Sequence, residues 1–245
     1  MLTEERLALI CEFVERNGSA TIQDIMEYTG ASESTVRRDL SELNKQLKVQ
    51  RVRGGAISRK LGTRDIKVQS RRTLNSDDKE IIAGYAAGLI KNDDFVYIDS
   101  GTTTERVIEH IEAKDAVFVT NSLTVIRLLA SRNLRCYILG GEFKESTDAI
   151  VGEYALDSIS KYNFTKGFFG TNGITKKNGF TTPEAKEAMV KQAAMKNTRD
   201  AFILADAAKF GAISSVKFAD FQSARIITTK LRNKDYLSCR NITIV

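Results

Sequence analysis

The sequence is poor in the residues that build metal centres and disulfide frameworks. Its three cysteines, Cys11, Cys136 and Cys239, lie far apart and form no C-x-x-C pair. Their odd number and spacing argue against a disulfide framework and a zinc site, and favour small buried side chains in a reducing compartment. The single histidine, His110, is expected to face solvent on a helix. We therefore predict no metal ion and no cofactor.

Long apolar runs are also absent. No run approaches the roughly 18 apolar residues that a membrane span needs. The N-terminal residues lack the basic and apolar regions of a secretory signal peptide. We therefore expect a cytoplasmic protein that does not associate with a membrane.

The net charge of +6 is concentrated in one part of the 245-residue chain. Residues 1–30 carry two basic and six acidic side chains, whereas residues 31–72 carry twelve basic and four acidic ones. Such a basic block is typical of a protein that binds a polyanion, although a solvated linker has the same composition. The length fits two domains. We place them at residues 1–57 and 77–245, with a linker at residues 58–76.

Residues 1–57 have the pattern of three helices followed by a hairpin. Apolar residues at helical spacing predict a first helix that ends at Asn17-Gly18. Residues 21–24 have the spacing of a capping box for a second helix, and Gly30 then makes a tight turn. Ser32 is a good N-cap for a third helix that runs to about residue 47.

The third helix presents a polar, positively charged face to solvent. Its apolar stripe, which is expected to pack on the core, consists of Val36, Leu40, Leu43 and Leu47. A helix fits the major groove of B-DNA, and arginines of an adjoining hairpin suit phosphate and minor-groove contacts. An ordinary amphipathic surface helix is the alternative. The predicted DNA-binding residues are Ser32, Ser34, Thr35, Arg37, Arg38, Ser41, Lys45, Arg51 and Arg53.

Two strings in this region form a specific motif pair. Residues 34–40 read STVRRDL, and residues 53–56 read RGGA. The pair resembles the signature of the DeoR family of bacterial transcriptional regulators, which carry the first string on the recognition helix and the second at the end of the wing. The resemblance implies a winged helix-turn-helix that binds double-stranded operator DNA. We expect Asp39 to orient Arg38 or to cap within the domain, because DNA would repel a carboxylate.

From residue 79 the pattern changes to short apolar strands that alternate with helices. This alternation predicts an α/β domain with a parallel sheet that is covered on both faces. We expect helices at residues 79–92, 102–111 and 123–131. We expect strands at residues 95–98, 116–119, 135–139, 166–169, 202–204, 225–228 and 242–245. Ligands of such sheets bind at the carboxyl ends of the strands, so a binding site is expected in the loops that follow them.

The loops after the predicted strands are rich in Gly, Thr, Ser and Asn, as in residues 99–104 (DSGTTT) and 120–122 (TNS). Their amides and hydroxyls suit a phosphate, although such residues also serve as ordinary caps and turn formers. Lys209 is either a phosphate ligand or a surface lysine near Asp206. The predicted effector-binding residues are Asp99, Gly101, Thr102, Thr103, Thr104, Asn121, Ser122, Gly140, Gly141, Asn172, Glu184 and Lys209.

These loops, together with GTNGI at 170–174 and GFTTPE at 179–184, resemble the DeoR-family sensor domain in the same order. The resemblance then covers nearly the whole chain. That sensor is similar in fold to ribose-phosphate isomerases and glucosamine-phosphate deaminases, which implies a phosphosugar ligand. The two strings look most like those of fructose-operon regulators. The resemblance therefore implies fructose 1-phosphate as the effector and repression of a sugar-utilisation operon.

Two other functions remain open, an isomerase-like enzyme and a DNA-binding protein without a small-molecule effector. Proton transfer on a sugar needs a positioned acid or base. Where the isomerases carry an acidic residue, this chain has Asn172, whose amide cannot shuttle a proton. Asp99, Glu184 and Asp206 remain as acids, but we predict no catalytic residue. We predict instead a regulator that acts as a homo-oligomer, a dimer or a tetramer, on paired operator half-sites.

Overall fold

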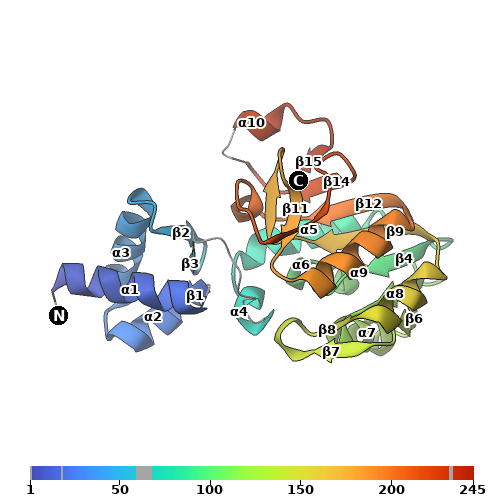
Figure 1. Cartoon of the computed structure of the whole chain (residues 1–245), viewed down its shortest axis with the longest axis horizontal. Helices are drawn as coiled ribbons and strands as arrows, with labels where there is room; N and C mark the ends of the chain where they lie inside the picture. The colour runs from blue at the N-terminus through green and yellow to red at the C-terminus, as the bar shows by residue number, and fades with distance from the viewer. Residues whose placement is uncertain (1, 18, 59–67, 232–233) are drawn as a thin grey trace. The chain divides into compact units, whose positions relative to one another are not determined.

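The computed structural model describes residues 2–17, 19–58, 68–231 and 234–245. The chain forms two compact units, Met1–Ser76 and Asp77–Val245 (Figure 1). Residues 59–67 of the predicted linker and Gly18 at the predicted helix end lie outside the described residues; the rest of the linker segment contains helix α4 (Val68–Arg72). Within the described ranges, no helix has both the length and the apolar character needed to cross a membrane.

The first unit packs three helices against a small antiparallel sheet. The helices are α1 (Thr3–Asn17), α2 (Ile22–Thr29) and α3 (Glu33–Lys45), and the strands lie in the order β1 (Ser19–Thr21), β3 (Gly55–Ser58), β2 (Val49–Val52). The predicted capping box is confirmed, since the amide of Asp24 donates to Thr21 Oγ1 at 3.1 Å and the amide of Thr21 donates to Asp24 Oδ2 at 2.8 Å. The predicted hairpin is β2–β3, and β1 is a third strand that the sequence pattern did not reveal.

The core of the first unit contains Val36, Leu40 and Leu43 as predicted, but the assignment of Leu47 to it was wrong. Leu47 lies beyond the end of α3 with φ +58°, and 65% of its surface is exposed. The amides of Leu47 and Lys48 donate to the carbonyls of Asn44 and Leu43, which is the Schellman pattern that ends a helix. The left-handed turn rotates Leu47 off the apolar stripe, and the helix ends two residues earlier than expected.

The second unit is built on a seven-stranded, wholly parallel sheet. In spatial order its strands are β15 (Ile242–Ile244), β14 (Arg225–Thr228), β12 (Thr198–Leu204), β9 (Phe164–Gly170), β4 (Phe95–Ile98), β5 (Val117–Thr120) and β6 (Arg135–Ile138). All seven predicted strands are confirmed, with ends that differ by a few residues. The chain runs from β4 to β6 towards one edge, returns to β9 beside β4, and then builds outward to the other edge.

Helices cover both faces of this sheet (Figure 1). One core packs α5 (Ser76–Ala87), α6 (Thr102–Val107), the 3₁₀ turn Ile108–His110 and α7 (Leu123–Ser131) on one face. The other core packs α8 (Glu153–Ser160) and α9 (Ala185–Lys196) on the opposite face. The helix expected at residues 79–92 starts and ends earlier, because Gly88 begins a turn that leads into β4.

Smaller elements that the sequence did not indicate join these layers. They are the hairpin β7 (Glu142–Lys144) and β8 (Ala149–Val151), the three-stranded sheet β10 (Gly173–Thr175), β11 (Gly179–Thr182) and β13 (Val216–Ala219), the 3₁₀ turns Glu145–Thr147 and Ala207–Lys209, and α10 (Lys234–Leu237). They surround the segments that follow the parallel strands. Their three-residue to four-residue lengths are too short for a hydrophobic period to mark them.

Two expectations about single side chains were wrong. The three cysteines are partly exposed rather than buried. His110 does not simply face solvent, because its Nε2 lies 2.6 Å from Glu80 Oε1 on α5, and Arg106 Nη1 lies 2.8 Å from Glu80 Oε2. These partners are 30 and 26 residues away in sequence, so no local pattern shows them.

We predict that Gly55→Ala destabilises the first unit by roughly 1–3 kcal/mol. A Cβ at Gly55 would lie 2.1 Å from the carbonyl oxygen of Ala20 on β1, so the sheet would have to open. Thermal or denaturant unfolding of the purified chain measures the loss. Gly140→Ala is the matched control, because no atom lies within 4 Å of its added Cβ. Equal stability of the two variants would contradict the proposed packing.

Candidate nucleic-acid interface and ligand site

Helix α3 and strand β2 bring several of the predicted DNA-binding residues together. Arg51 Nη1 donates to Ser41 Oγ at 2.5 Å, and the amide of Arg51 donates to Asn44 Oδ1 at 2.9 Å. The wing arginine therefore lies beside the polar face of α3. The predicted residues that are exposed are Ser32, Ser34, Arg37, Arg38, Lys45, Arg51 and Arg53, while Thr35 and Ser41 are partly buried.

The charges on this face differ in how they are compensated. Arg37 pairs with Glu33, one helical turn earlier, at 2.6 Å, and both side chains are about half exposed. An exposed pair of this kind contributes little stability. Arg38 Nε instead donates to the carbonyl of Ser34 at 3.4 Å, a contact that leaves its charge unneutralised. Arg38 is therefore the stronger source of positive potential on α3.

The N-cap position predicted for α3 is confirmed, whereas the role predicted for Asp39 was wrong. Ser32 occupies the N-cap position, but its hydroxyl bonds the hydroxyls of Ser34 and Thr35 at 3.1 and 3.0 Å rather than a backbone amide. Asp39 does not orient Arg38. It is buried and accepts from Arg6 of α1, with 2.6 Å between Oδ2 and Nε. Asp39 thus fixes the third helix to the first.

The turn of the wing is held by a residue that the sequence analysis missed. The amide of Arg53 donates to Asn75 Oδ1 at 3.0 Å, and the amide of Asn75 donates to the carbonyl of Arg53 at 3.3 Å. Asn75 is buried and has φ +53°, a conformation that asparagine tolerates better than most residues. This two-way clamp sets the backbone position from which the Arg53 side chain leaves the wing.

The predicted ligand residues follow five neighbouring strands of the parallel sheet. In spatial order, β12 precedes Lys209, β9 precedes Asn172, β4 precedes Asp99, β5 precedes Asn121, and β6 precedes Gly140. Because the strands are parallel, all of these residues lie at one edge of the sheet. The direction of chain growth reverses between β4 and β9, and such a reversal is where open α/β sheets form a ligand crevice.

A buried ion pair links the ends of β4 and β9. Asp99 is fully buried, and its Oδ2 accepts from the amide of Gly170 at 2.8 Å and from Lys191 Nζ of α9. Lys191 Nζ also donates to the carbonyl of Gly170 at 3.2 Å and lies 5.6 Å from the centre of the Phe218 ring. Asp99 Oδ1 makes no hydrogen bond within the described residues.

A second buried group lies one turn earlier on α9. Glu187 accepts from Thr147 and, at 3.1 Å, from Lys144, and its other oxygen lies 3.5 Å from Thr182 Oγ1. Thr182 Oγ1 in turn lies 3.3 Å from Asn172 Oδ1. Burial opposes ionisation of Glu187, but the Thr147 hydrogen bond and the charges of Lys191 and Lys144 outweigh it and lower its pKa.

Several predicted ligand residues are engaged inside the protein. Thr104 Oγ1 accepts from the Gly101 amide at 2.9 Å and caps its own helix. Asn121 accepts from the fully buried Tyr97 hydroxyl at 3.1 Å and donates to the carbonyl of Ile150 at 3.2 Å. Burial first, and then the charge of Asp99, raise the pKa of Tyr97, so its phenol remains a donor. Glu184 caps α9 by accepting from the amides of Lys186 and Glu187.

The chain's own Asp148 carboxylate occupies the loop between β5 and α7. Its Oδ2 accepts from Ser122 Oγ at 2.9 Å and from the amide of Thr124 at 2.7 Å.

Gly141 has φ +147°, and a Cβ there would meet the Val151 carbonyl oxygen at 2.7 Å, so close packing explains this glycine. Asp99, Gly101, Thr102 and Thr103 lie at the end of β4, whereas Lys209, at the end of a 3₁₀ turn, and the exposed Gly140 follow other strands.

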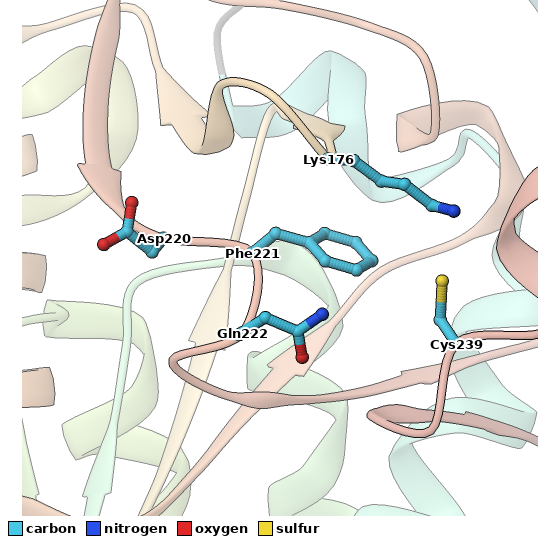
Figure 2. Close-up of a pocket in the computed structure, with 5 residues that line it drawn as sticks. All are labelled: Lys176, Asp220, Phe221, Gln222 and Cys239. Carbon is cyan, nitrogen blue, oxygen red and sulfur yellow. The ribbon is translucent and has the colours of Figure 1, made fainter.

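A separate cavity of about 260 Å³ contains none of the predicted ligand residues, and Figure 2 draws the residues that line it. It is lined by Lys176, Asp220, Phe221, Gln222 and Cys239. One cation and no hydroxyl side chain make a poor donor set for a phosphate. Elsewhere in the described residues, no group of three or more His, Cys, Asp and Glu side chains is arranged to hold a metal ion.

Comparison with known proteins identifies the family of the chain. Residues 6–61 match the DeoR-like helix-turn-helix domain, and residues 74–230 match the DeoR C-terminal sensor domain. The chain belongs to the DeoR family. It is therefore a transcriptional regulator with a DNA-binding winged helix-turn-helix and an α/β sensor domain.

Curated relatives match this DeoR-family chain over all or most of its length. It is 41% identical over 250 residues to the uncharacterized HTH-type transcriptional regulator FruR of Bacillus subtilis (strain 168), covering 100% of this chain and 98% of that protein. It is 33% identical over 215 residues to the lactose phosphotransferase system repressor of Staphylococcus aureus (strain NCTC 8325 / PS 47), covering 86% and 85%. The first relative is named as a transcriptional regulator and the second as a repressor.

Solved structures resemble the chain more distantly. Ribose 5-phosphate isomerase A from Methanocaldococcus jannaschii gives a TM-score of 0.42 at 14% identity, over 56% of this chain and 55% of that one. Translation initiation factor eIF-2B from Pyrococcus horikoshii OT3 gives 0.45 at 12% identity, over 87% and 73%. Likeness at this level says nothing about the chemistry of the DeoR-family sensor.

We predict that Arg51→Ala weakens binding to DNA from the gene's own upstream region. If Arg51 contacts a base, the loss is about 1–3 kcal/mol. If Arg51 contacts a phosphate, the slope of the affinity against salt concentration falls by about one ion. The side chain is exposed and is held against α3 by Ser41. Fluorescence anisotropy at several salt concentrations measures both quantities. Arg199→Ala, an exposed arginine of the sensor unit, serves as the control. Unchanged affinity and salt slope in Arg51→Ala would remove Arg51 from the interface.

We predict that acid weakens the sensor unit partly through Glu187. Its pKa is lower in the folded chain than the ordinary value of 4.5. The stability this gives is complete above the unfolded pKa and is lost as the pH falls through the folded pKa. Glu187→Gln should therefore lose less stability than the wild-type chain below about pH 4.5. Thermal unfolding across this range measures the difference, with exposed Glu145→Gln as the control. Parallel pH profiles would refute the role of Glu187.

Proposed function

We propose that the chain represses a sugar-utilisation operon and that a phosphorylated sugar, fructose 1-phosphate in the favoured case, modulates its binding to operator DNA. The observation that supports the proposal is that predicted ligand residues follow neighbouring parallel strands on both sides of the reversal between β4 and β9. The names of the relatives agree with it, since one is FruR and another is a lactose phosphotransferase system repressor.

For DNA, we propose that α3 enters the major groove and that the wing contacts the adjoining backbone. Arg38 donates to the Ser34 carbonyl rather than to a carboxylate, and Ser41 holds Arg51 beside α3. Bases would be read by the exposed side chains of α3, and phosphates by Arg51 and Arg53. The Arg6–Asp39 pair supports this interface by fixing α3 to α1.

For the effector, we propose that the phosphate binds the loop after β4, at Gly101, Thr102 and Thr103, with Lys209 as a point charge from the loop after β12. Gly101 is followed by three buried threonines, of which Thr104 caps the helix. Asn172 and Glu184 would contact the sugar or support the groups that do. Asn121 and Ser122 have internal hydrogen-bond partners, and Gly141 is closely packed, so these residues support the loops around the site.

Regulation follows from differential affinity. We propose that a homo-oligomer pairs two recognition helices on operator half-sites and that the effector binds one arrangement of the oligomer better than another. The shift in DNA affinity cannot exceed the ratio of the effector's affinities for the two arrangements. The direction of the shift is then set by which arrangement fits the half-site spacing.

We expect labelled DNA from the gene's upstream region to bind tightly and with strong salt dependence, and fructose 1-phosphate to alter the binding. Fluorescence anisotropy with a panel of phosphosugars and a random-sequence DNA measures both. Specific binding that the whole panel leaves unchanged would disprove the sensor function and keep the DNA-binding function. No preference over random DNA would disprove both, and isomerase assays on the same sugars would then test the enzyme alternative.

A further inference from the structure

The ion pair between Asp99 and Lys191 is buried at the carboxyl end of the parallel sheet. Both side chains are more than nine-tenths buried, at 1% and 8% exposure. Removing two opposite charges from water is unfavourable, and apolar residues of similar volume often stabilise a fold equally well. The pair therefore calls for a role other than stability.

The hydrogen-bonding capacity of the pair is used unevenly. Asp99 Oδ2 receives both the Gly170 amide and Lys191 Nζ, whereas Asp99 Oδ1 receives no donor within the described residues. An ionised carboxylate accepts through both oxygens, and a buried acceptor left without a donor is costly. The hydrogen bonds to Oδ2 thus fix the whole carboxylate, while Oδ1 can still accept a hydrogen bond from a further donor.

The pair also lies at the place where the fold reverses. Asp99 directly follows β4 and Gly170 ends β9, the two strands between which chain growth changes direction. The backbones are close there, since a Cβ at Gly101 would lie 3.4 Å from Gly170 Cα. Asp99, which carries the unpaired Oδ1, is therefore two residues before Gly101, where the loop proposed to hold the phosphate begins.

A carboxylate oxygen discriminates between the parts of a phosphorylated ligand. It repels phosphate oxygens and accepts a hydrogen bond from a hydroxyl. We propose that Asp99 and Lys191 are the specificity determinant of the sensor, which accepts a phosphate ester only when the ester also carries a hydroxyl that donates to Asp99 Oδ1. This inference rests on the proposed sensing of a phosphorylated sugar and adds the chemical group that is read.

Lys191 is the positioning residue in this arrangement. Its bonds to Asp99 Oδ2 and the Gly170 carbonyl orient the carboxylate. Because Asp99 is fully buried, a hydroxyl reaches Oδ1 only when the loop after β4 shifts. Binding of a ligand hydroxyl to Asp99 Oδ1 is thereby linked to movement of the segment that precedes α6.

The first test uses the wild-type chain and compares fructose 1-phosphate, methyl phosphate and inorganic phosphate by their effect on DNA anisotropy and melting temperature. We expect fructose 1-phosphate to act at a concentration about tenfold or more below the other two, the loss expected for a missing hydrogen bond to a charged group. Equal action of methyl phosphate would overturn the reading of a hydroxyl and leave phosphate sensing in place. Action by none of a wider phosphosugar panel would overturn both proposals.

The second test replaces the pair by apolar residues in Asp99→Leu/Lys191→Met. Circular dichroism and DNA binding report whether this variant folds. We expect its midpoint for fructose 1-phosphate to rise about tenfold or more. The matched control is Asp157→Leu/Lys161→Met, which removes an exposed pair of the same types at 2.6 Å. A midpoint equal to that of the control would overturn the role of the pair. If the double variant does not fold, the wild-type ligand comparison decides.

Discussion

The reversal of chain direction between β4 and β9 is the constraint on which the sensor unit depends. A parallel sheet puts every strand's carboxyl end on one edge, and the reversal leaves the loops after two neighbouring strands free to diverge. Asp99 and Gly170 meet at that point. The loops after β5 and β6 lie at the same edge but are engaged by Asp148 and by close packing, so the edge is not uniformly available.

Helix α9 joins packing to electrostatics. Its apolar side chains belong to the core on one face of the sheet. The charged side chains of Glu187 and Lys191, which lie one turn apart, are buried as well. Each charge is compensated by a different segment, Glu187 by Thr147 and Lys144, and Lys191 by Asp99. A movement of α9 would therefore disturb contacts to β4 and to the β7–β8 hairpin together.

The first unit solves a different problem, which is to fix exposed basic side chains on a small core. Asp39 and Arg6 lock α3 to α1, Asn75 clamps the wing, and Ser41 and Asn44 hold Arg51. Preorganised side chains lose less conformational entropy when they bind. The unit thus uses buried or half-buried polar contacts to position the residues that remain open to solvent.

The sequence by itself determined the elements whose signals are local. Helical spacing, the Thr21 capping box, the apolar strands and the two motif strings identified the helices of the first unit, all seven parallel strands and the family. Tertiary structure alone decided the partners: Arg6 for Asp39, Glu80 for His110, and Lys191 for Asp99, which are 33, 30 and 92 residues apart. A glutamate and a lysine four residues apart on a helix ordinarily mark a solvated face. Their burial on α9 depends on which loops the sheet brings over them, and that is a property of the whole fold.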